Sequence, residues 1–291
     1  MAEGKMSLPM ARGAGETSRR DLWWLQPLAV FLGFSTFIGY STWAAFQNDH
    51  YTYGSYISPF YSPALLYSPT QDAEKSKSRA HEKSSITRAD EQKAHTFCGP
   101  KPAWWPGFLP FSAALLILPF PGLFRFTCYY YRGAYYKAFW ADPINCGVGE
   151  PRKSYWGENS LPLILQNLHR YALYAALVFI VILAYDALQG FIFINDDGSK
   201  RFGVGVGSFV LVLNVCLLGS YTLGCHSMRH LIGGHRDELA KSKTQKKLYD
   251  CVTCLNGKHG MWAWFSLFWV GFSDVYVRLC SMGIWTDFRL L

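Results

Sequence analysis

The residues best suited to redox or metal chemistry lie in one short stretch, Cys225-His226-Ser227-Met228-Arg229-His230. In a helix, His226 and His230 would lie four residues apart on one face, one above the other. Cys225 lies directly beside them. Two imidazoles and a thiol at the end of a long apolar helix suit a redox or metal site. A histidine near a helix C-terminus can also simply face the helix dipole, and a cysteine can be a small core residue, so the stretch alone leaves both interpretations open.

The composition indicates an all-α membrane protein. Of the 291 residues, 50% are hydrophobic and only 16% are charged, against about 25% in a typical soluble domain. Several apolar runs reach the length of about 18 residues that a membrane-spanning helix needs. The net charge of +8 therefore concerns orientation and membrane lipids. We expect no nucleic-acid partner, because no basic module with interleaved aromatic residues is visible.

The apolar runs predict a bundle of five transmembrane helices in a domain spanning 21–291. A disordered segment, 1–20, precedes the domain, and an external loop, 47–103, follows the first helix. Within that loop, the prolines of Ser58-Pro59-Phe60-Tyr61-Ser62-Pro63 exclude regular structure. Pro110, Pro119 and Pro121 should kink the second helix. The predicted helices cover residues 22–46, 104–126, 161–194, 204–232 and 259–282.

Basic residues predict the orientation of this bundle. The loops after the second and fourth helices are rich in lysine and arginine, whereas the loop after the third holds only Lys200 and Arg201, offset by two aspartates. The positive-inside rule then places the N-terminus and both basic loops in the cytoplasm.

This topology brings the other reactive residues to the cytoplasmic membrane face. Ionisable groups at membrane depth are costly and usually face a bundle interior or a cavity, which favours a functional site. Two cysteines and two histidines could hold a Rieske-type [2Fe–2S] centre, and two histidines could instead hold a haem. Zinc fits the ligand types but would not explain the position at the membrane. The residues concerned are Cys128, Cys146, His169, Cys225, His226, His230 and His259.

Two further patterns have simpler explanations. Cys251 and Cys254 form a CxxC with no partner pair, which we interpret as an accidental pair in a loop. Asp274 and Arg278 lie four residues apart and are interpreted as a structural pair within the membrane. The chain has no nucleotide fingerprint and no nucleophile–base motif, so we do not expect a self-contained enzyme.

Several motifs resemble the membrane-anchor, cytochrome b-like subunit of the mycobacterial (actinobacterial) type of succinate dehydrogenase. One is the tyrosine-rich run from Phe124 to Arg132, with Tyr135-Tyr136 and Phe139-Trp140 behind it. The resemblance runs from the first helix to the C-terminus. The other motifs are Leu163-Ile164-Leu165-Gln166-Asn167, His169-Arg170-Tyr171, Tyr185-Asp186, Cys225-His226-Ser227 and the segment from Ser58 to Pro63.

The resemblance implies a succinate:quinone oxidoreductase (complex II) in the bacterial cytoplasmic (inner) membrane. A flavoprotein subunit would oxidise succinate, and an iron–sulfur subunit would pass the electrons to this anchor, where quinone is reduced. A Rieske-type [2Fe–2S] centre would take the place of haem. Its candidate ligands are Cys128, Cys146, Cys225, His226 and His230, followed by His169 and His259. The resemblance leaves a higher oligomer of the complex open.

Quinone binding needs an apolar slot with a few polar groups for the quinone carbonyls. Trp156, His169, Arg170 and Tyr174, all near the third helix, are the candidates. The alternatives are an anchor that binds haem b in the same complex, and a membrane transporter or structural protein without a cofactor.

Overall fold

A computed structural model describes most of the chain. Of the predicted disordered segment 1–20, only the part from residue 13 is described, and residues 67–95 and 97 of the predicted external loop lie outside the described residues. The chain divides into two compact units, which we describe separately: Met1–Ile38 with Arg125–His169, and Gly39–Phe124 with Arg170–Leu291. The described residues are 13–66, 96, 98–142, 144–152, 160–161, 163–194, 199–234 and 237–291.

The described residues are mostly helical, as the composition predicts. Two short antiparallel hairpins accompany the helices: β1 (Thr52–Tyr53) with β2 (Tyr56–Ile57), and β3 (Ile192–Ile194) with β4 (Lys200–Phe202). The helices are α1 (Leu25–Gln47), α4 (Ala114–Ile117), α5 (Pro119–Phe126), α6 (Tyr129–Tyr135), the π-helix η1 (Tyr136–Trp140), the 3₁₀ helix η2 (Leu163–Leu168), α7 (His169–Gln189), α8 (Val206–Leu223), α9 (His226–Gly233), the 3₁₀ turn η3 (Leu239–Lys241), α10 (Lys243–Gly257) and α11 (His259–Ser281).

Three helices of the described residues are long and apolar enough to cross a membrane by length and composition: Leu25–Gln47, Leu163–Gln189 and Val206–Leu223. The apolar helix Ala114–Phe126 is shorter. α11 has 23 residues but is not among the three, and it carries both Asp274 and Arg278. The count of five spans therefore stays a prediction, as does the cytoplasmic N-terminus.

The predicted helix over 104–126 is helical only from Ala114. Before that point the chain forms turns, in which Trp105 N–H donates to the Pro102 carbonyl and Leu109 N–H donates to the Pro106 carbonyl. Proline has no N–H to donate and clashes with the preceding helical turn, so repeated prolines keep this part out of a helix. Pro119 begins α5, a position where the missing N–H costs nothing.

The predicted helix over 161–194 is shorter than expected at both ends. It begins with the 3₁₀ helix η2, and α7 ends at Gln189. Ile192–Ile194 then forms strand β3 instead of a last helical turn. Its β-branched and aromatic residues favour a strand once a partner strand is present. The predicted turn at 195–198 lies outside the described residues.

The predicted helix over 204–232 is broken in two. α8 ends at Leu223, Cys225 is extended (φ −68°, ψ 145°), and α9 begins at His226. The break lies where α10 approaches: a Cβ on Gly224 would stand only 3.2 Å from Leu255 and 2.7 Å from the Ser220 carbonyl oxygen. The helical reading of Cys225 was therefore wrong, whereas His226 and His230 do share one helix.

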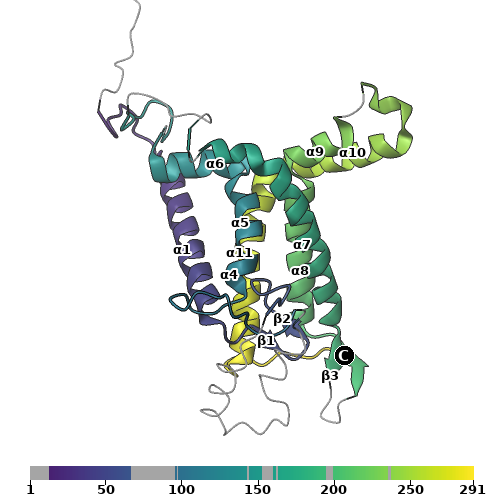
Figure 1. Cartoon of the computed structure of the whole chain (residues 1–291). Coiled ribbons are helices and arrows are strands. Elements are labelled where there is room, and N and C mark those ends of the chain that lie inside the picture. Colours follow the sequence, from purple (N-terminus) through teal and green to yellow (C-terminus); the bar gives the residue numbers. More distant parts are fainter. Residues whose placement is uncertain are drawn as a thin grey trace, which may run out of the picture. The chain divides into compact units, whose positions relative to one another are not determined.

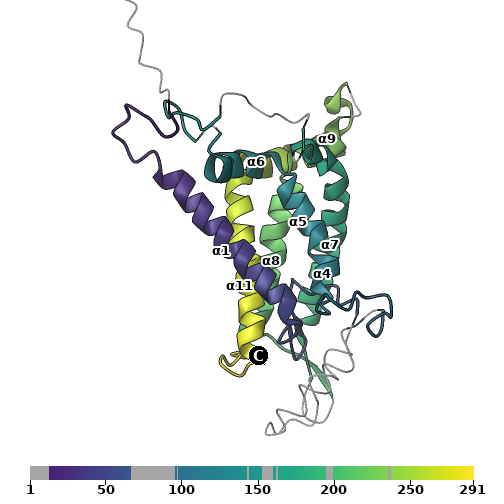
Figure 2. The same cartoon turned by 60° about the vertical axis from the view of Figure 1, so that its left-hand side comes forward.

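The basic segment 235–258, predicted as a loop, contains helix α10. Ser242 caps the helix by accepting a hydrogen bond from Gln245 N–H (3.5 Å), and a Ser-x-x-Gln pattern is a recognised helix start. α10 packs against α9, and the two helices run across the direction of α8 and α11 at one end of these helices (Figures 1 and 2). The β-hairpins and the C-terminus lie at the opposite end (Figure 1).

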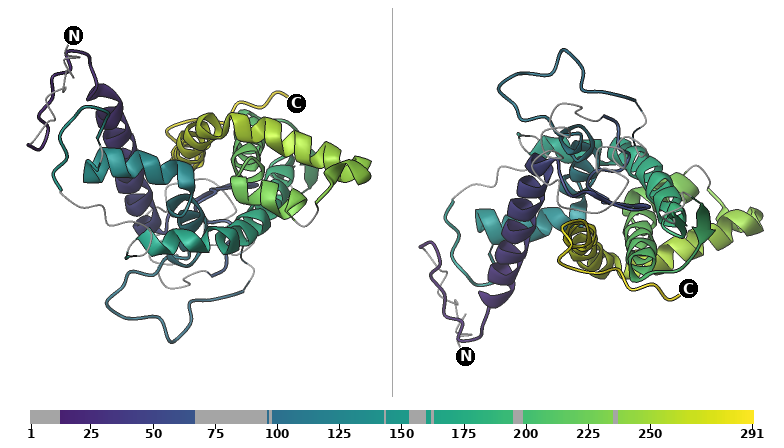
Figure 3. Two further views of the ribbon diagram at one scale, coloured as in Figure 1. Left: turned by 90° about the horizontal axis from the view of Figure 1, so that it is seen from above. Right: turned by 90° about the horizontal axis from the view of Figure 1, so that it is seen from below.

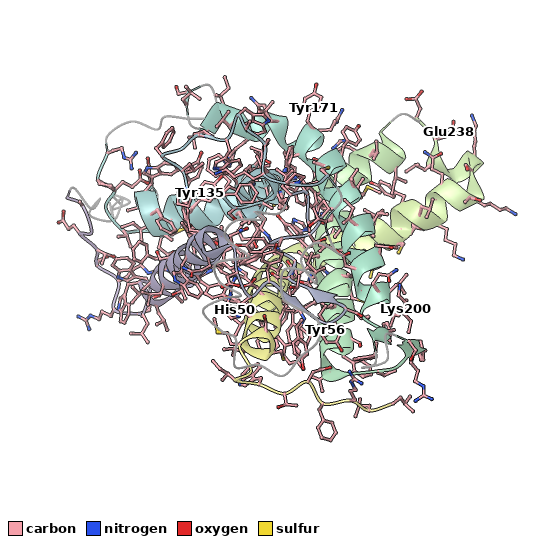
Figure 4. The ribbon with its side chains drawn as sticks, turned by 60° about the horizontal axis from the view of Figure 1, so that its bottom comes forward. His50, Tyr56, Tyr135, Tyr171, Lys200 and Glu238 are labelled. Atoms are coloured by element: carbon pink, nitrogen blue, oxygen red, sulfur yellow. The ribbon has the colours of Figure 1, made fainter. Side chains whose placement is uncertain are left out.

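At that opposite end, Asp287 ties the C-terminal tail to α8. Its carboxylate accepts hydrogen bonds from Tyr56 OH (2.9 Å), Tyr276 OH (2.7 Å) and Gly207 N–H (2.9 Å). Tyr56 and His50 lie near this end of α11 (Figure 4), where His50 Nδ1 is 3.4 Å from Ser281 Oγ. The segment from Ser58 to Pro63 has no regular structure, in agreement with its prolines.

Asp274 is the polar centre of the second unit. It is fully buried, and its carboxylate accepts hydrogen bonds from Tyr40 OH, Ser58 Oγ and Arg278 Nε, the last at 3.2 Å. Arg278 also donates to the Asp49 carbonyl (2.8 Å). The predicted structural pair is thereby confirmed, and it joins α11 to the end of α1 and to the segment that follows.

We expect Asp274→Ala to lower the free energy of unfolding by about 3–5 kcal/mol, because Arg278 would stay buried without its counter-charge. Unfolding in detergent micelles, followed by circular dichroism, measures this loss. Replacing both partners, as Asp274→Leu with Arg278→Met, should cost less than the single change. A single variant as stable as the wild-type protein would contradict the assignment.

Candidate functional site

His226 and His230 form a close imidazole pair on α9. Their Nε2 atoms are 3.1 Å apart, and the rings meet edge to face with centroids 4.6 Å apart. Both side chains are exposed. The predicted i, i+4 pairing is thus present in the structure.

The neighbouring helix α10 holds α9 in place. Arg229 donates to Tyr249 OH (2.8 Å) and stacks over the Tyr249 ring, and Asn256 donates to the Gly224 carbonyl (2.8 Å). A Cβ on Gly233 would meet the Tyr249 ring at 2.8 Å, so this position requires glycine for the close packing. These contacts fix the helix that carries both imidazoles.

The surroundings of His226 favour its neutral form. Partial burial lowers the pKa of His226 from its usual value, and it is lowered further because a positive charge on His230 or Arg229 opposes one on His226. A neutral imidazole can act as a metal ligand, whereas a protonated one cannot.

The two Nε2 atoms lie within hydrogen-bond distance of each other, and their spacing is also that of two nitrogen ligands on one metal ion. Metal–nitrogen bonds of about 2.0–2.1 Å put two adjacent ligands about 3 Å apart, whereas the two axial ligands of a haem, on opposite faces, are about 4 Å apart. The separation of 3.1 Å matches the first arrangement. Among the residues that the structure describes, no group of three or more His, Cys, Asp or Glu is gathered for a metal. The pair by itself can supply two nitrogen ligands.

The candidate cysteines differ in their surroundings. Cys225 and Cys128 are both 2% exposed, and each is the extended residue directly before a short helix, α9 and α6 respectively. Cys146 is exposed, and its backbone is held by Arg19 and Asn145. Cys128 and Cys146 belong to the first unit, and Cys225 belongs to the second.

In the first unit, α6 and η2 are joined by a chain of hydrogen bonds. Arg132 donates to Gln166 Oε1 (3.3 Å), Gln166 donates to Tyr135 OH (2.6 Å), and Tyr135 donates to the Phe126 carbonyl (2.8 Å). Burial raises the pKa of Tyr135 to about 12. The Tyr135 hydroxyl therefore stays protonated and keeps both hydrogen bonds at neutral pH.

The quinone candidates are only partly brought together. His169 Nδ1 lies 2.9 Å from Thr127 Oγ1, which orients the imidazole at the start of α7. Arg170 and Tyr174 follow on α7 as exposed residues, in the second unit. Trp156 lies outside the described residues.

One arrangement in the second unit was not predicted. His259, at the start of α11, stacks on Tyr221 of α8 with centroids 4.9 Å apart, and Phe124 meets Tyr221 edge-on at 5.4 Å. Tyr221 precedes the candidate ligand Cys225 by four residues, and this spacing could have indicated that Tyr221 belongs to the site. Thr127 was missed as well, because nothing in its sequence context singles it out.

Comparison with known proteins shows the family of this chain. The family model for the actinobacterial succinate dehydrogenase subunit SdhC matches residues 25–283. The chain belongs to this family. It is therefore a membrane-anchor subunit of succinate dehydrogenase, a succinate:quinone oxidoreductase, as the tyrosine-rich and Cys-His motifs predicted.

A solved structure agrees with this assignment. A chain of the Mycobacterium smegmatis Sdh1 complex in the apo form is 33% identical to this chain and superposes on it with a TM-score of 0.78. The match covers 100% of this chain and 98% of that one. No curated protein sequence matches the chain.

The raised pKa of Tyr135 predicts a pH-dependent contribution to stability. Since the ordinary pKa of tyrosine is about 10, the unfolded state loses this proton first as the pH rises. The contribution is therefore complete below about pH 10 and is lost between there and about pH 12. Free energies of unfolding measured in micelles from about pH 8 to pH 11 should fall less steeply for Tyr135→Phe than for the wild-type chain. Tyr171→Phe, at an exposed tyrosine, is the matched control, and equal pH slopes for wild type and Tyr135→Phe would refute the prediction.

Proposed function

We propose that this chain is the quinone-reducing subunit of its complex and passes electrons from an iron–sulfur subunit to quinone. The observation that carries the proposal is the His226–His230 pair, whose nitrogens are 3.1 Å apart beyond the end of a membrane-length helix. Two imidazoles in this geometry suit redox-metal ligation at a membrane surface. We further propose the cytoplasmic membrane of a bacterium as the location, with the N-terminus and α9 on the cytoplasmic side.

The partners follow from the family. A succinate dehydrogenase needs a flavoprotein subunit to oxidise succinate and an iron–sulfur subunit to carry the electrons. The solved relative is part of a complex, which supports the same kind of assembly for this chain. We propose that the iron–sulfur subunit docks near α9, because electrons have to reach the imidazole pair from that partner.

We propose a Rieske-type [2Fe–2S] centre as the cofactor, which would relay single electrons. His226 and His230 would be its nitrogen ligands, and Cys225 is the sulfur candidate in the same unit. Cys128 and Cys146 stay predictions from the sequence as further sulfur ligands. Haem b is the alternative cofactor, but the spacing of the pair does not suit two axial ligands.

Quinone would bind along α7. Arg170 and Tyr174 can each donate a hydrogen bond to a quinone carbonyl, and the lipid-soluble substrate can reach them because both are exposed. Thr127 orients the imidazole of His169, the third candidate. Trp156 stays a prediction from the sequence.

Replacing both histidines, as His226→Ala with His230→Ala, should lower quinone reduction by the complex more than about 100-fold, because loss of even second-shell metal partners costs about 10–100-fold. Succinate oxidation by an artificial acceptor should be unchanged, since the flavoprotein is untouched. Ser227→Ala, on the same helix, is the control and should retain quinone reduction. Retained quinone reduction in the double variant would remove the pair from the electron path.

The cofactor itself is identified by spectroscopy of the same samples. Low-temperature electron paramagnetic resonance of the reduced wild-type complex should show a Rieske-type signal with a low average g value, and the double variant should lack it. Sharp visible bands in a reduced-minus-oxidised optical spectrum would instead identify haem b.

Tyr174→Phe tests the quinone site. Loss of one hydrogen bond worth about 0.5–1.5 kcal/mol should raise KM for quinone roughly 2–12-fold, with KM for succinate unchanged. Tyr171→Phe removes a hydroxyl from the same helix, three residues earlier, at a side chain that is 70% exposed. It should leave both constants unchanged, and equal effects of the two variants would exclude a specific role for Tyr174.

A further inference from the structure

The α9–α10 hairpin, residues 226–257, presents two different faces of α10. One face packs on α9: Gln245 donates to the Ile232 carbonyl, Tyr249 bonds Arg229, and Asn256 donates to the Gly224 carbonyl. Together with the buried Val252, these positions are spaced four, three and four residues apart, which is the spacing of one helical stripe.

The opposite face of α10 carries a second stripe. Its positions are spaced four, four, three and four residues apart, and all of its side chains are exposed. The stripe consists of Lys243, Lys247, Cys251, Cys254 and, directly after the helix, Lys258. The CxxC pair therefore lies on a helix between lysines, and not in a loop as the sequence suggested.

The lysines of this stripe have no carboxylate partner in the described part of the chain, whereas their neighbours do. Lys241 pairs with Glu238 (2.9 Å), and Lys246 pairs with Asp250 (2.7 Å). Neither Lys243, Lys247 nor Lys258 forms an ion pair with a described residue. The positive charge of the hairpin is thus concentrated on the face that turns away from α9.

The hairpin is held at the level where the membrane-length helices end. Only Gly224 and Cys225 separate α8 from α9, and only Lys258 separates α10 from α11. Seen from above, α9 and α10 lie side by side, and Glu238 marks the far tip of the hairpin (Figures 3 and 4). The lysine stripe therefore forms the outer edge of a hairpin that projects sideways from the ends of α8 and α11.

We infer that this edge binds the headgroups of anionic phospholipids. Lysine side chains near a membrane surface are attracted to acidic lipids, and their long stems can lie along the interface while the charge reaches a phosphate. The attraction contributes on the order of a fivefold preference per lysine. Such contacts would fix the hairpin, and with it the helix of the imidazole pair, against the membrane.

Lysine labelling on the full chain in its complex tests the inference. The complex is placed in nanodiscs of phosphatidylcholine alone, or of phosphatidylcholine with phosphatidylglycerol, and acetylated with a limiting amine reagent. Mass spectrometry then gives the labelling rate of each lysine. We expect Lys243, Lys247 and Lys258 to react roughly fivefold more slowly in the anionic discs, and high salt to remove the difference.

Lys241 and Lys246 are the internal controls, because they belong to the same hairpin but are paired with carboxylates. Their labelling rates should hardly depend on the lipid. Lys243→Gln with Lys247→Gln should lower the phosphatidylglycerol that purifies with the complex, whereas Lys200→Gln with Arg201→Gln, at the other end of the molecule, should not.

Three outcomes would overturn the inference. Equal labelling in both lipids would show that headgroups do not bind this edge. Equally slow labelling in both lipids, relative to the two control lysines, would indicate a partner protein that covers the edge. Protection by inorganic phosphate in discs of phosphatidylcholine alone would indicate a site for free anions instead of a lipid surface.

Discussion

The burial of one carboxylate, that of Asp274, constrains much of the second unit. A charged group in a membrane-length helix is costly unless it is paired and fully hydrogen-bonded. Asp274 meets this condition only with groups from three separate parts of the chain: Tyr40 at the end of α1, Ser58 in the irregular segment, and Arg278 on its own helix. The irregular segment from Ser58 to Pro63 is therefore joined to α11 by a hydrogen bond, and to α1 by the contact of Phe60 with Tyr40. Asp287 makes a second such connection, at the end with the β-hairpins, where it accepts hydrogen bonds from Tyr56 and from Gly207 of α8.

Sequence patterns located the apolar helices better than they located the points where those helices are interrupted. Hydropathy predicts where apolar helices lie, but it does not register a single glycine, so the break at Gly224 was missed. At that break Leu255 of another helix lies close to Gly224, a contact that no local pattern reveals. α10 was taken for a loop because lysines suggested exposure, although Ser242 and Gln245 form a helix-start pattern. The strand Ile192–Ile194 was absorbed into a helix because a short apolar run does not distinguish the two.

For the site, spacing was informative only within one helix. The pairing of His226 with His230 follows from the i, i+4 rule and needs no tertiary information. The hydrogen bond between Thr127 and His169 and the stacking of His259 on Tyr221 join residues about 40 apart, so no spacing rule could have predicted them. The family resemblance rested on whole motifs, and for that reason it survived errors in the helix boundaries.

The break between α8 and α9 also determines how far the imidazoles stand from the apolar layer. A straight continuation of α8 would carry His230 about 10 Å beyond Leu223, at about 1.5 Å per residue. Instead the chain turns at Gly224 and Cys225, and α9 runs across the ends of α8 and α11 (Figure 1). The break at Gly224 and Cys225 therefore keeps the imidazole pair close to the end of α8. In the proposed electron path to quinone, this break would shorten the distance that an electron travels.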